Sequence, residues 1–157
     1  MSLSSYLPQA VGLLPKWQLI VSSMAVFNTI QNFVTLSLTK RIYSKQPQNV
    51  NPLQSRTFGI WTLTAAILRF YCAYNVNNKA IYELTMWSYV LAFSHFTSEL
   101  LVFRTAGLGP GVLSPFVVSS ESFGLPILVE FRPNLPEHTA LSFTWMWNQY
   151  DFYLSGQ

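Results

Sequence analysis

Three long apolar stretches alternate with polar connections along the chain, and this pattern predicts three helices. The stretches cover 17–38, 57–74 and 81–103. Each is roughly 18–23 residues long, so each helix would cover most or all of the ~30 Å hydrocarbon layer of a bilayer. The sequence therefore predicts an all-α, polytopic membrane helix bundle with three clear spans.

A fourth apolar stretch is interrupted. Residues 110–122 are apolar but too short to span a bilayer, and 143–150 form an aromatic-rich tail. Between them, 123–142 carries prolines and charged side chains, which are atypical of a membrane helix. We expect a partial fourth span, built from 110–122 with 143–150, in a single membrane domain over 1–157. The atypical insertion at 123–142 is either a genuine segment or a retained intron in the gene model.

Polar side chains form a stripe along the first stretch. Asn28, Gln31, Asn32 and Thr35 recur at i, i+3, i+4 and i+7, which places them on one helical face. Such a stripe indicates hydrogen bonding between helices, and a ligand-binding lining is the alternative. Asn28 and Gln31 are therefore candidate seam residues.

The third stretch carries ionisable groups. Ser88, Ala92, His95 and Glu99 share one helical face, at spacings of four, three and four. A charge at the centre of a bilayer costs roughly 2.5–3.5 kcal/mol, so these groups are expected to face other helices. We interpret Ser88, His95 and Glu99 as a packing and partner-docking seam. Proton exchange by His95 and Glu99 is the alternative; two ligands do not make a metal site, and no metal or cofactor is expected.

The second and third stretches are expected to form an antiparallel hairpin that turns at 75–80. At ~1.5 Å per residue, Arg56 and Glu99 lie at equal depth on this hairpin, whereas Arg69 and Glu99 do not. We therefore predict an ion pair between Arg56 and Glu99. Arg69 is expected to reach the membrane interface by snorkelling.

Composition supports a membrane protein. Half of the 157 residues are hydrophobic and only 10% are charged, whereas about 25% are charged in soluble domains. The net charge is +3, and one polar connection holds Lys40, Arg41, Lys45 and Arg56 without any acid. This charge predicts a cytoplasmic loop and not a nucleic-acid partner. Cys72 is the only cysteine, so no intrachain disulfide can form.

Two sequence blocks, LQSRTFGIWT at 53–62 and HFTSELLVFRT at 95–105, resemble the ergosterol biosynthetic protein 28 family. The blocks FNTIQ at 27–31 and GPGVLSPFVVSS at 109–120 add to the resemblance. The first of the four blocks contributes four candidate interaction residues: Arg56, Thr57, Gly59 and Trp61. The insertion at 123–142 departs from the family pattern.

The resemblance implies a non-enzymatic, multi-pass scaffold of the fungal endoplasmic reticulum membrane. Its implied partners are membrane lipid and three enzymes of sterol C4-demethylation: the C4-methyl oxidase, the 3-hydroxysteroid dehydrogenase/decarboxylase and the 3-keto reductase. Two other functions remain open. One is a small sterol-binding or transport protein with polar stripes along a pathway, and the other is an intramembrane enzyme that uses His95 and Glu99.

Overall fold

A computed structural model describes residues 6–107 and 146–155, and all regular structure in these ranges is helical. The three long helices are α1 (Leu14–Val34), α3 (Pro52–Tyr74) and α4 (Lys79–Leu101). The described part also contains three short elements, α2 (Ser37–Ile42), the 3₁₀ helix η2 (Pro47–Asn49) and α7 (Tyr150–Leu154), and residues 146–148 are helical as well. The all-α prediction is confirmed for these residues.

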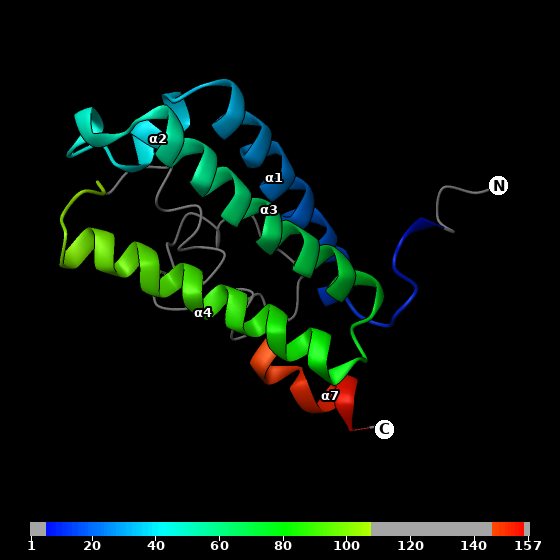
Figure 1. The fold of residues 1–157 in the computed structure, drawn as a ribbon. Helices are drawn as coiled ribbons and strands as arrows, with labels where there is room; N and C mark the ends of the chain where they lie inside the picture. The colour runs from blue at the N-terminus through cyan, green and yellow to red at the C-terminus, as the bar shows by residue number, and fades with distance from the viewer. Residues whose placement is uncertain (1–5, 108–145, 156–157) are drawn as a thin grey trace, which may run out of the picture.

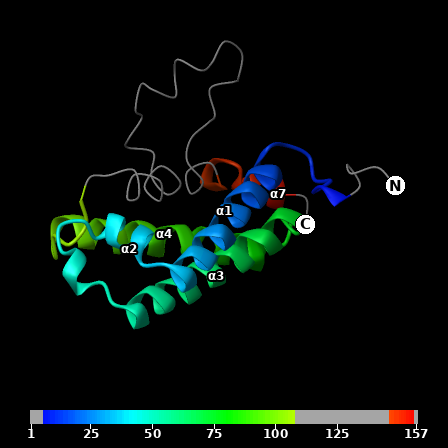
Figure 2. The same cartoon turned by 90° about the horizontal axis from the view of Figure 1, so that it is seen from above.

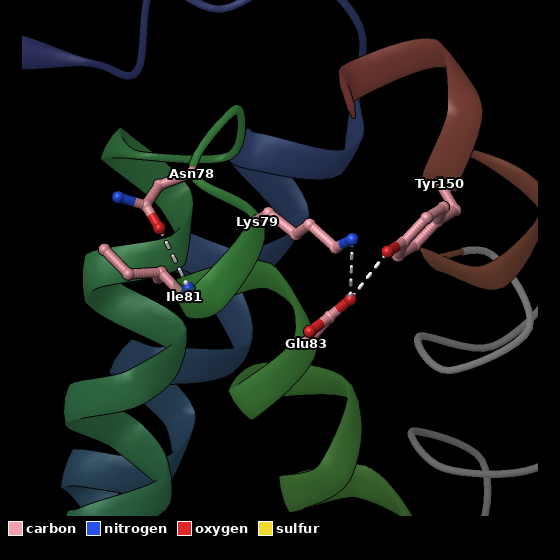
Figure 3. Close-up of polar contacts among 5 residues, drawn as sticks. All are labelled: Asn78, Lys79, Ile81, Glu83 and Tyr150. Atoms are coloured by element: carbon pink, nitrogen blue, oxygen red, sulfur yellow. Dashed lines mark hydrogen bonds and ion pairs between the residues drawn. The ribbon is translucent and has the colours of Figure 1, made fainter. Parts of the chain in front are cut away.

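Asparagine caps define where α3 and α4 begin. The Asn51 side chain accepts a hydrogen bond from the Gln54 amide at 2.9 Å, and Pro52 fills the first position of α3. The Asn78 side chain accepts from the Ile81 amide at 3.2 Å (Figure 3). Such caps satisfy amides that have no partner within the helix, and proline suits the first helical turn. Because of the Asn51 cap, α3 begins five positions before the predicted 57–74 stretch.

The predicted first helix over 17–38 is two helices. Its backbone becomes extended at Thr35, where φ is −147° and ψ is 151°, and α1 therefore ends at Val34. The Thr35 hydroxyl accepts a hydrogen bond from the Ser37 amide at 3.2 Å, which starts α2 in a new direction. Threonine favours such local side-chain-to-backbone bonds over a continuous helix.

The predicted membrane-crossing bundle is wrong. None of the helices in the described ranges combines the length and the apolarity that a membrane crossing requires. The physical reason is that each long helix carries polar side chains: Gln18, Asn28, Gln31 and Asn32 in α1, Arg69 in α3, and Glu83, His95 and Glu99 in α4. The predicted multi-pass location in the membrane is therefore not supported either. Most of the predicted fourth span and the whole insertion at 123–142 lie outside the described residues.

Helices α1 and α3 lie side by side along most of their length, and α4 returns beneath α3 as the second arm of a hairpin (Figures 1 and 2). The contact between α1 and α3 is the most extensive between any two described elements. Helix α2, the start of α3 and the end of α4 gather at one end of the bundle. The turn between α3 and α4 lies at the other end, beside α7.

Small side chains line the contact between α1 and α3. Ser22, Ala25 and Thr29 of α1 are buried, as are Ser55, Gly59 and Ala66 of α3. Their size allows side chains of one helix to bond backbone carbonyls of the other: Ser22 Oγ donates to Ala66 O at 2.8 Å and Thr29 Oγ1 to Gly59 O at 3.3 Å. Small residues in a helical seam permit this close approach of two backbones.

Buried tyrosines fasten the C-terminal residues to the bundle. The Tyr82 hydroxyl donates to the Met146 carbonyl at 2.5 Å, and the Tyr89 hydroxyl donates to Gln18 Oε1 at 2.8 Å. Tyr82 and Tyr89 are fully buried, together with Leu14. The rings of Tyr82 and Tyr89 therefore join α1, α4 and the chain before α7, and each of the two buried hydroxyls has an acceptor.

A polar contact also joins α7 to α4, as Figure 3 shows. The Tyr150 hydroxyl donates to Glu83 Oε1 at 2.6 Å, and Lys79 Nζ lies 3.9 Å from the same carboxylate oxygen. Lys79 and Glu83 are one turn apart on α4 and form the only ion pair within 6–107 and 146–155. Tyr150, the last residue of the aromatic-rich 143–150 tail, thus connects α7 to α4.

Candidate functional site

His95 lies in a cluster of aromatic side chains near the end of α4. Its Nε2 atom is 2.9 Å from the Tyr43 hydroxyl, and its ring contacts Trp61 edge-on with centroids 5.1 Å apart. Tyr43 belongs to the loop after α2, Trp61 to α3 and His95 to α4, so the cluster unites three segments. Phe58 contacts Tyr43 edge-on, and Phe96 contacts Phe58 edge-on, which completes the cluster. We call these five residues the His95 cluster.

Glu99 closes the end of α4 and does not bond His95. Its carboxylate accepts a hydrogen bond from the Thr105 hydroxyl, and its carbonyl accepts from the Thr105 amide at 2.9 Å and the Ala106 amide at 3.2 Å. The intervening Arg104 has a left-handed backbone with φ of 55°, as the tight reversal after the helix requires. Glu99 therefore acts as a C-terminal anchor for the segment that follows α4.

The predicted ion pair between Arg56 and Glu99 is wrong. Arg56 is exposed on α3, and the structure places no ion pair between it and Glu99. Its neighbour Ser55 faces α1, and successive side chains on a helix point about 100° apart. Equal depth does not suffice for an ion pair, which also requires that both side chains face each other.

Arg69 does not snorkel to a surface. It is 8% exposed, and its guanidinium lies 4.4 Å from the centroid of the Tyr89 ring. The Tyr89 hydroxyl is held by Gln18, so the ring is fixed beneath the cation. Cation–π contact of this kind stabilises a desolvated guanidinium by about 2 kcal/mol.

Burial sets the protonation states of the His95 cluster. It lowers the pKa of the His95 imidazole, and the Glu99 charge opposes that shift. It raises the pKa of the Tyr43 hydroxyl, and here the Glu99 charge acts in the same direction. Near neutral pH both groups are therefore uncharged, a state in which the Tyr43 hydroxyl can donate to His95 Nε2.

Stability should fall as the pH is lowered through the His95 titration. The folded-state pKa lies below the unfolded value of about 6.5, so the unfolded state binds more protons in that window and stability is lost there. We expect a lower thermal midpoint at pH 5 than at pH 7.5, and a smaller difference in His95→Gln. His138→Gln removes the other histidine and serves as the control. An unchanged pH dependence in His95→Gln would contradict this assignment.

The structure unites some predicted candidates and separates others. Trp61 and His95 meet in the His95 cluster, and Gly59 packs against Asn32 in the contact between α1 and α3. Ser88 Oγ donates to Thr85 O at 2.7 Å, and Thr57 Oγ1 donates to Leu53 O at 3.0 Å, so both bond their own helix.

The predicted stripe on α1 bonds only in part. Asn28 Oδ1 accepts from Asn32 Nδ2 at 3.4 Å, while Gln31 is half-buried. The central member is Asn32, whose Oδ1 accepts from the Thr39 hydroxyl at 2.6 Å and whose carbonyl accepts from Ser55 Oγ at 2.8 Å. Thr39 and Ser55 also contact each other at 3.0 Å. Sequence reasoning missed Thr39, Ser55 and Tyr43 because they lie in segments that looked like ordinary polar connections.

The described residues around His95 do not form a metal-binding group. Across the described ranges, no three His, Cys, Asp or Glu side chains are grouped to hold a metal ion. The polar groups of His95 and Glu99 are engaged by Tyr43 and Thr105. The arrangement is one that holds three segments together.

The outer helical faces are apolar. On α1, large exposed side chains recur at helical spacing, and α3 and α4 carry similar series. The series on α1 is Ile20, Met24, Phe27, Ile30 and Val34, and that on α4 is Leu84, Trp87 and Leu91. Contiguous exposed apolar surface on this scale marks contact with a protein or a lipid phase.

The fold and these contacts define a small protein whose described residues form a helical bundle, with hydrogen-bonded polar side chains inside and apolar helix faces outside. Residues 14–124 match the family described as Erg28 like protein. Curated relatives carry names of the same family. "Ergosterol biosynthetic protein 28" of Schizosaccharomyces pombe is 57% identical over 111 residues, which cover 71% of this chain and 81% of the relative. The Candida albicans protein of that name is 42% identical over 92% of this chain and 90% of its own.

The human "Ergosterol biosynthetic protein 28 homolog" is 43% identical over 78% of this chain and 87% of the relative. The chain therefore belongs to the ergosterol biosynthetic protein 28 family. No solved structure matches it.

Proposed function

We propose that the protein is a non-catalytic scaffold of sterol biosynthesis at the endoplasmic reticulum, where it gathers enzymes of sterol C4-demethylation. Membership of the family carries the proposal, because its curated members are named for ergosterol biosynthesis. The proposed partners are the sterol C4-methyl oxidase, the 3-hydroxysteroid dehydrogenase/decarboxylase and the 3-keto reductase.

Two structural features support a scaffold. The ionisable groups of His95 and Glu99, the candidate catalysts, are engaged in bonds that hold segments together. The large side chains of the outer faces, such as Phe27 and Trp87, are more than half exposed. Surfaces of this kind suit contacts with partner helices or with the hydrocarbon of the membrane.

Tethering has a physical benefit for consecutive enzymes. Binding them to one protein replaces encounters between separate molecules with local ones, at effective concentrations on the order of mM. Apolar intermediates can then pass between neighbouring active sites. No catalytic group of the scaffold is required for this effect.

Affinity capture of the tagged full chain from mild detergent tests the proposal. We expect the three C4-demethylation enzymes to be recovered, and Trp87→Ser combined with Leu91→Ser to reduce recovery by removing apolar contact on α4. Thr64→Ser is the control, since Thr64 is an exposed polar residue on α3 outside the candidate interaction residues. Recovery of none of the enzymes would contradict the proposal. Sterol turnover by the purified chain, lost in His95→Ala, would instead indicate an enzyme.

A further inference from the structure

Charged side chains are unevenly distributed along the bundle. Five exposed cations lie where α2, the start of α3 and the end of α4 gather, which is the left end in Figure 1. They are Lys40, Arg41, Lys45, Arg56 and Arg104. We call this group the basic end. Figure 2 shows the same elements together from a second direction.

Acidic residues do not balance the basic end. Of the carboxylates within 6–107 and 146–155, only Glu99 lies there, and it is half-buried and bonded to Thr105. At the opposite end, the cations Lys16 and Lys79 are matched by Glu83 and Asp151, and Lys79 is paired with Glu83 at 3.9 Å. Counted over these described residues, one end of the bundle is therefore strongly positive, whereas the other end has two carboxylates for three cations, one of which is the buried Arg69.

Tertiary contacts bring the cations of the basic end together. The Lys45 amide donates to the Thr105 carbonyl at 3.1 Å, and the Gly107 amide donates to the Ile42 carbonyl at 3.4 Å. These bonds hold the segment after α4, which carries Arg104, against the loop after α2. Cations that lie far apart in sequence thus share one surface.

Exposed apolar side chains flank the same end. They are Val34, Leu53, Leu101, Val102 and Phe103, each more than 60% exposed. A nucleic acid would engage the cations through its phosphates but offers no apolar phase for these side chains. A bilayer with anionic lipids offers both phosphate groups and hydrocarbon at one boundary.

We propose that the basic end binds the anionic headgroups of phospholipids, with the flanking apolar side chains in the adjoining acyl boundary. The headgroup phosphates accept hydrogen bonds from the lysine and arginine side chains. This inference is independent of the proposed role in sterol biosynthesis, because it concerns lipid class and not partner enzymes.

Vesicle sedimentation with the full chain tests the proposal. The measured quantity is the ratio of two association constants. The first is for vesicles of phosphatidylcholine with one-fifth phosphatidylserine, and the second is for vesicles of phosphatidylcholine alone. We expect this ratio to fall roughly 25-fold in Lys40→Gln combined with Lys45→Gln, since each cation near an anionic surface contributes about fivefold. Lys16→Gln combined with Lys79→Gln is the matched control: it removes the same charge from exposed lysines at the other end and should change the ratio less than threefold.

Three outcomes would overturn the inference. The first is a ratio near one for the unaltered chain, and the second is an equal loss in both double variants, which would reflect net charge alone. The third is preferential binding of single-stranded RNA over anionic vesicles at equal phosphate concentration, which would assign the basic end to nucleic acid. A loss confined to the Lys40 and Lys45 double variant supports the inference. This loss should be smaller at 0.5 M salt than at 0.1 M, because salt screens such contacts.

Discussion

Replacing Gly59 with leucine is expected to destabilise the protein by about 3 kcal/mol, because the position has no room for a large side chain. A Cβ atom there would lie 3.0 Å from Phe33 Cε2 and 3.2 Å from Asn32 Cβ. Both distances are shorter than the ~3.5–4.0 Å of favourable carbon contacts. The leucine would push α1 away from α3 and stretch the bond from Thr29 Oγ1 to the Gly59 carbonyl, which is already 3.3 Å long.

Thermal unfolding followed by helical circular dichroism measures this effect. At about 2–4 °C per kcal/mol for a chain of this size, the midpoint should fall by roughly 6–12 °C. Gly59→Ala should cost much less, because the Phe33 ring can shift and alanine favours a helix by about 1 kcal/mol over glycine. Thr64→Leu adds a leucine to the exposed face of α3 and is the control. A Gly59→Leu protein as stable as Thr64→Leu would refute the close contact of α1 with α3.

Replacing Asn32 with alanine should cost about 2–3 kcal/mol, because it removes the centre of a buried hydrogen-bond network. Asn32 is 2% exposed, and its Oδ1 accepts from the Thr39 hydroxyl at 2.6 Å. The substitution leaves the buried hydroxyl without its best acceptor and creates a small cavity. Ser55 Oγ, 3.0 Å from Thr39, offers a replacement acceptor, which keeps the cost below that of a fully orphaned group.

A double-mutant cycle isolates the bond between Asn32 and Thr39. Thr39→Val keeps the shape of the side chain and removes the hydroxyl, so its effect should overlap with that of Asn32→Ala. We expect a coupling free energy of about 1 kcal/mol from denaturant unfolding of the four proteins. Asn28→Ala, which removes only the 3.4 Å contact with Asn32, should change stability by less than about 0.5 kcal/mol. Strict additivity of Asn32→Ala and Thr39→Val would show that the two groups do not interact.

These two positions hold the end of the molecule that carries the basic end. Gly59 and Asn32 fix α3 against α1 and α2, and the His95 cluster lies on the same part of α3. Variants at either site are therefore expected to weaken lipid binding by loosening that end. The Lys40 and Lys45 variant should affect lipid binding alone, because both side chains are exposed.

Local sequence signals predicted the helices and their turn well. The polar connection at 75–80 contains the asparagine that caps α4, and such caps depend on residues three positions apart. Asn28 and Asn32 lie on one face of α1 as predicted, because a helical face follows from spacing alone, whereas Thr35 of the same stripe lies beyond the end of the helix. Length and hydropathy gave one wrong prediction, that of membrane crossing. The polar side chains within these helices make them less apolar than a membrane crossing requires.

The pairing of side chains between helices could not be predicted in this way. Arg56 and Glu99 matched in depth, but Glu99 bonds Thr105, six positions further along its own segment. Tyr43 and His95 are 52 positions apart, and no local pattern marks them as partners. Each pairing depends on the rotation of a helix about its axis and on its crossing angle, which the whole core decides.

The sequence by itself determined the helical class of the described residues, the excess of apolar and basic residues, and the resemblance to a family that the comparisons confirm. Only the tertiary structure decided which polar groups meet inside and which cations share a surface. It divided the expected first helix at Thr35, placed Tyr43 against His95 and joined Arg104 to the loop of Lys45. The physical reason is the separation along the chain of the residues involved. Spacing along a helix is fixed by neighbouring residues, whereas contacts between helices arise from the packing of the whole chain.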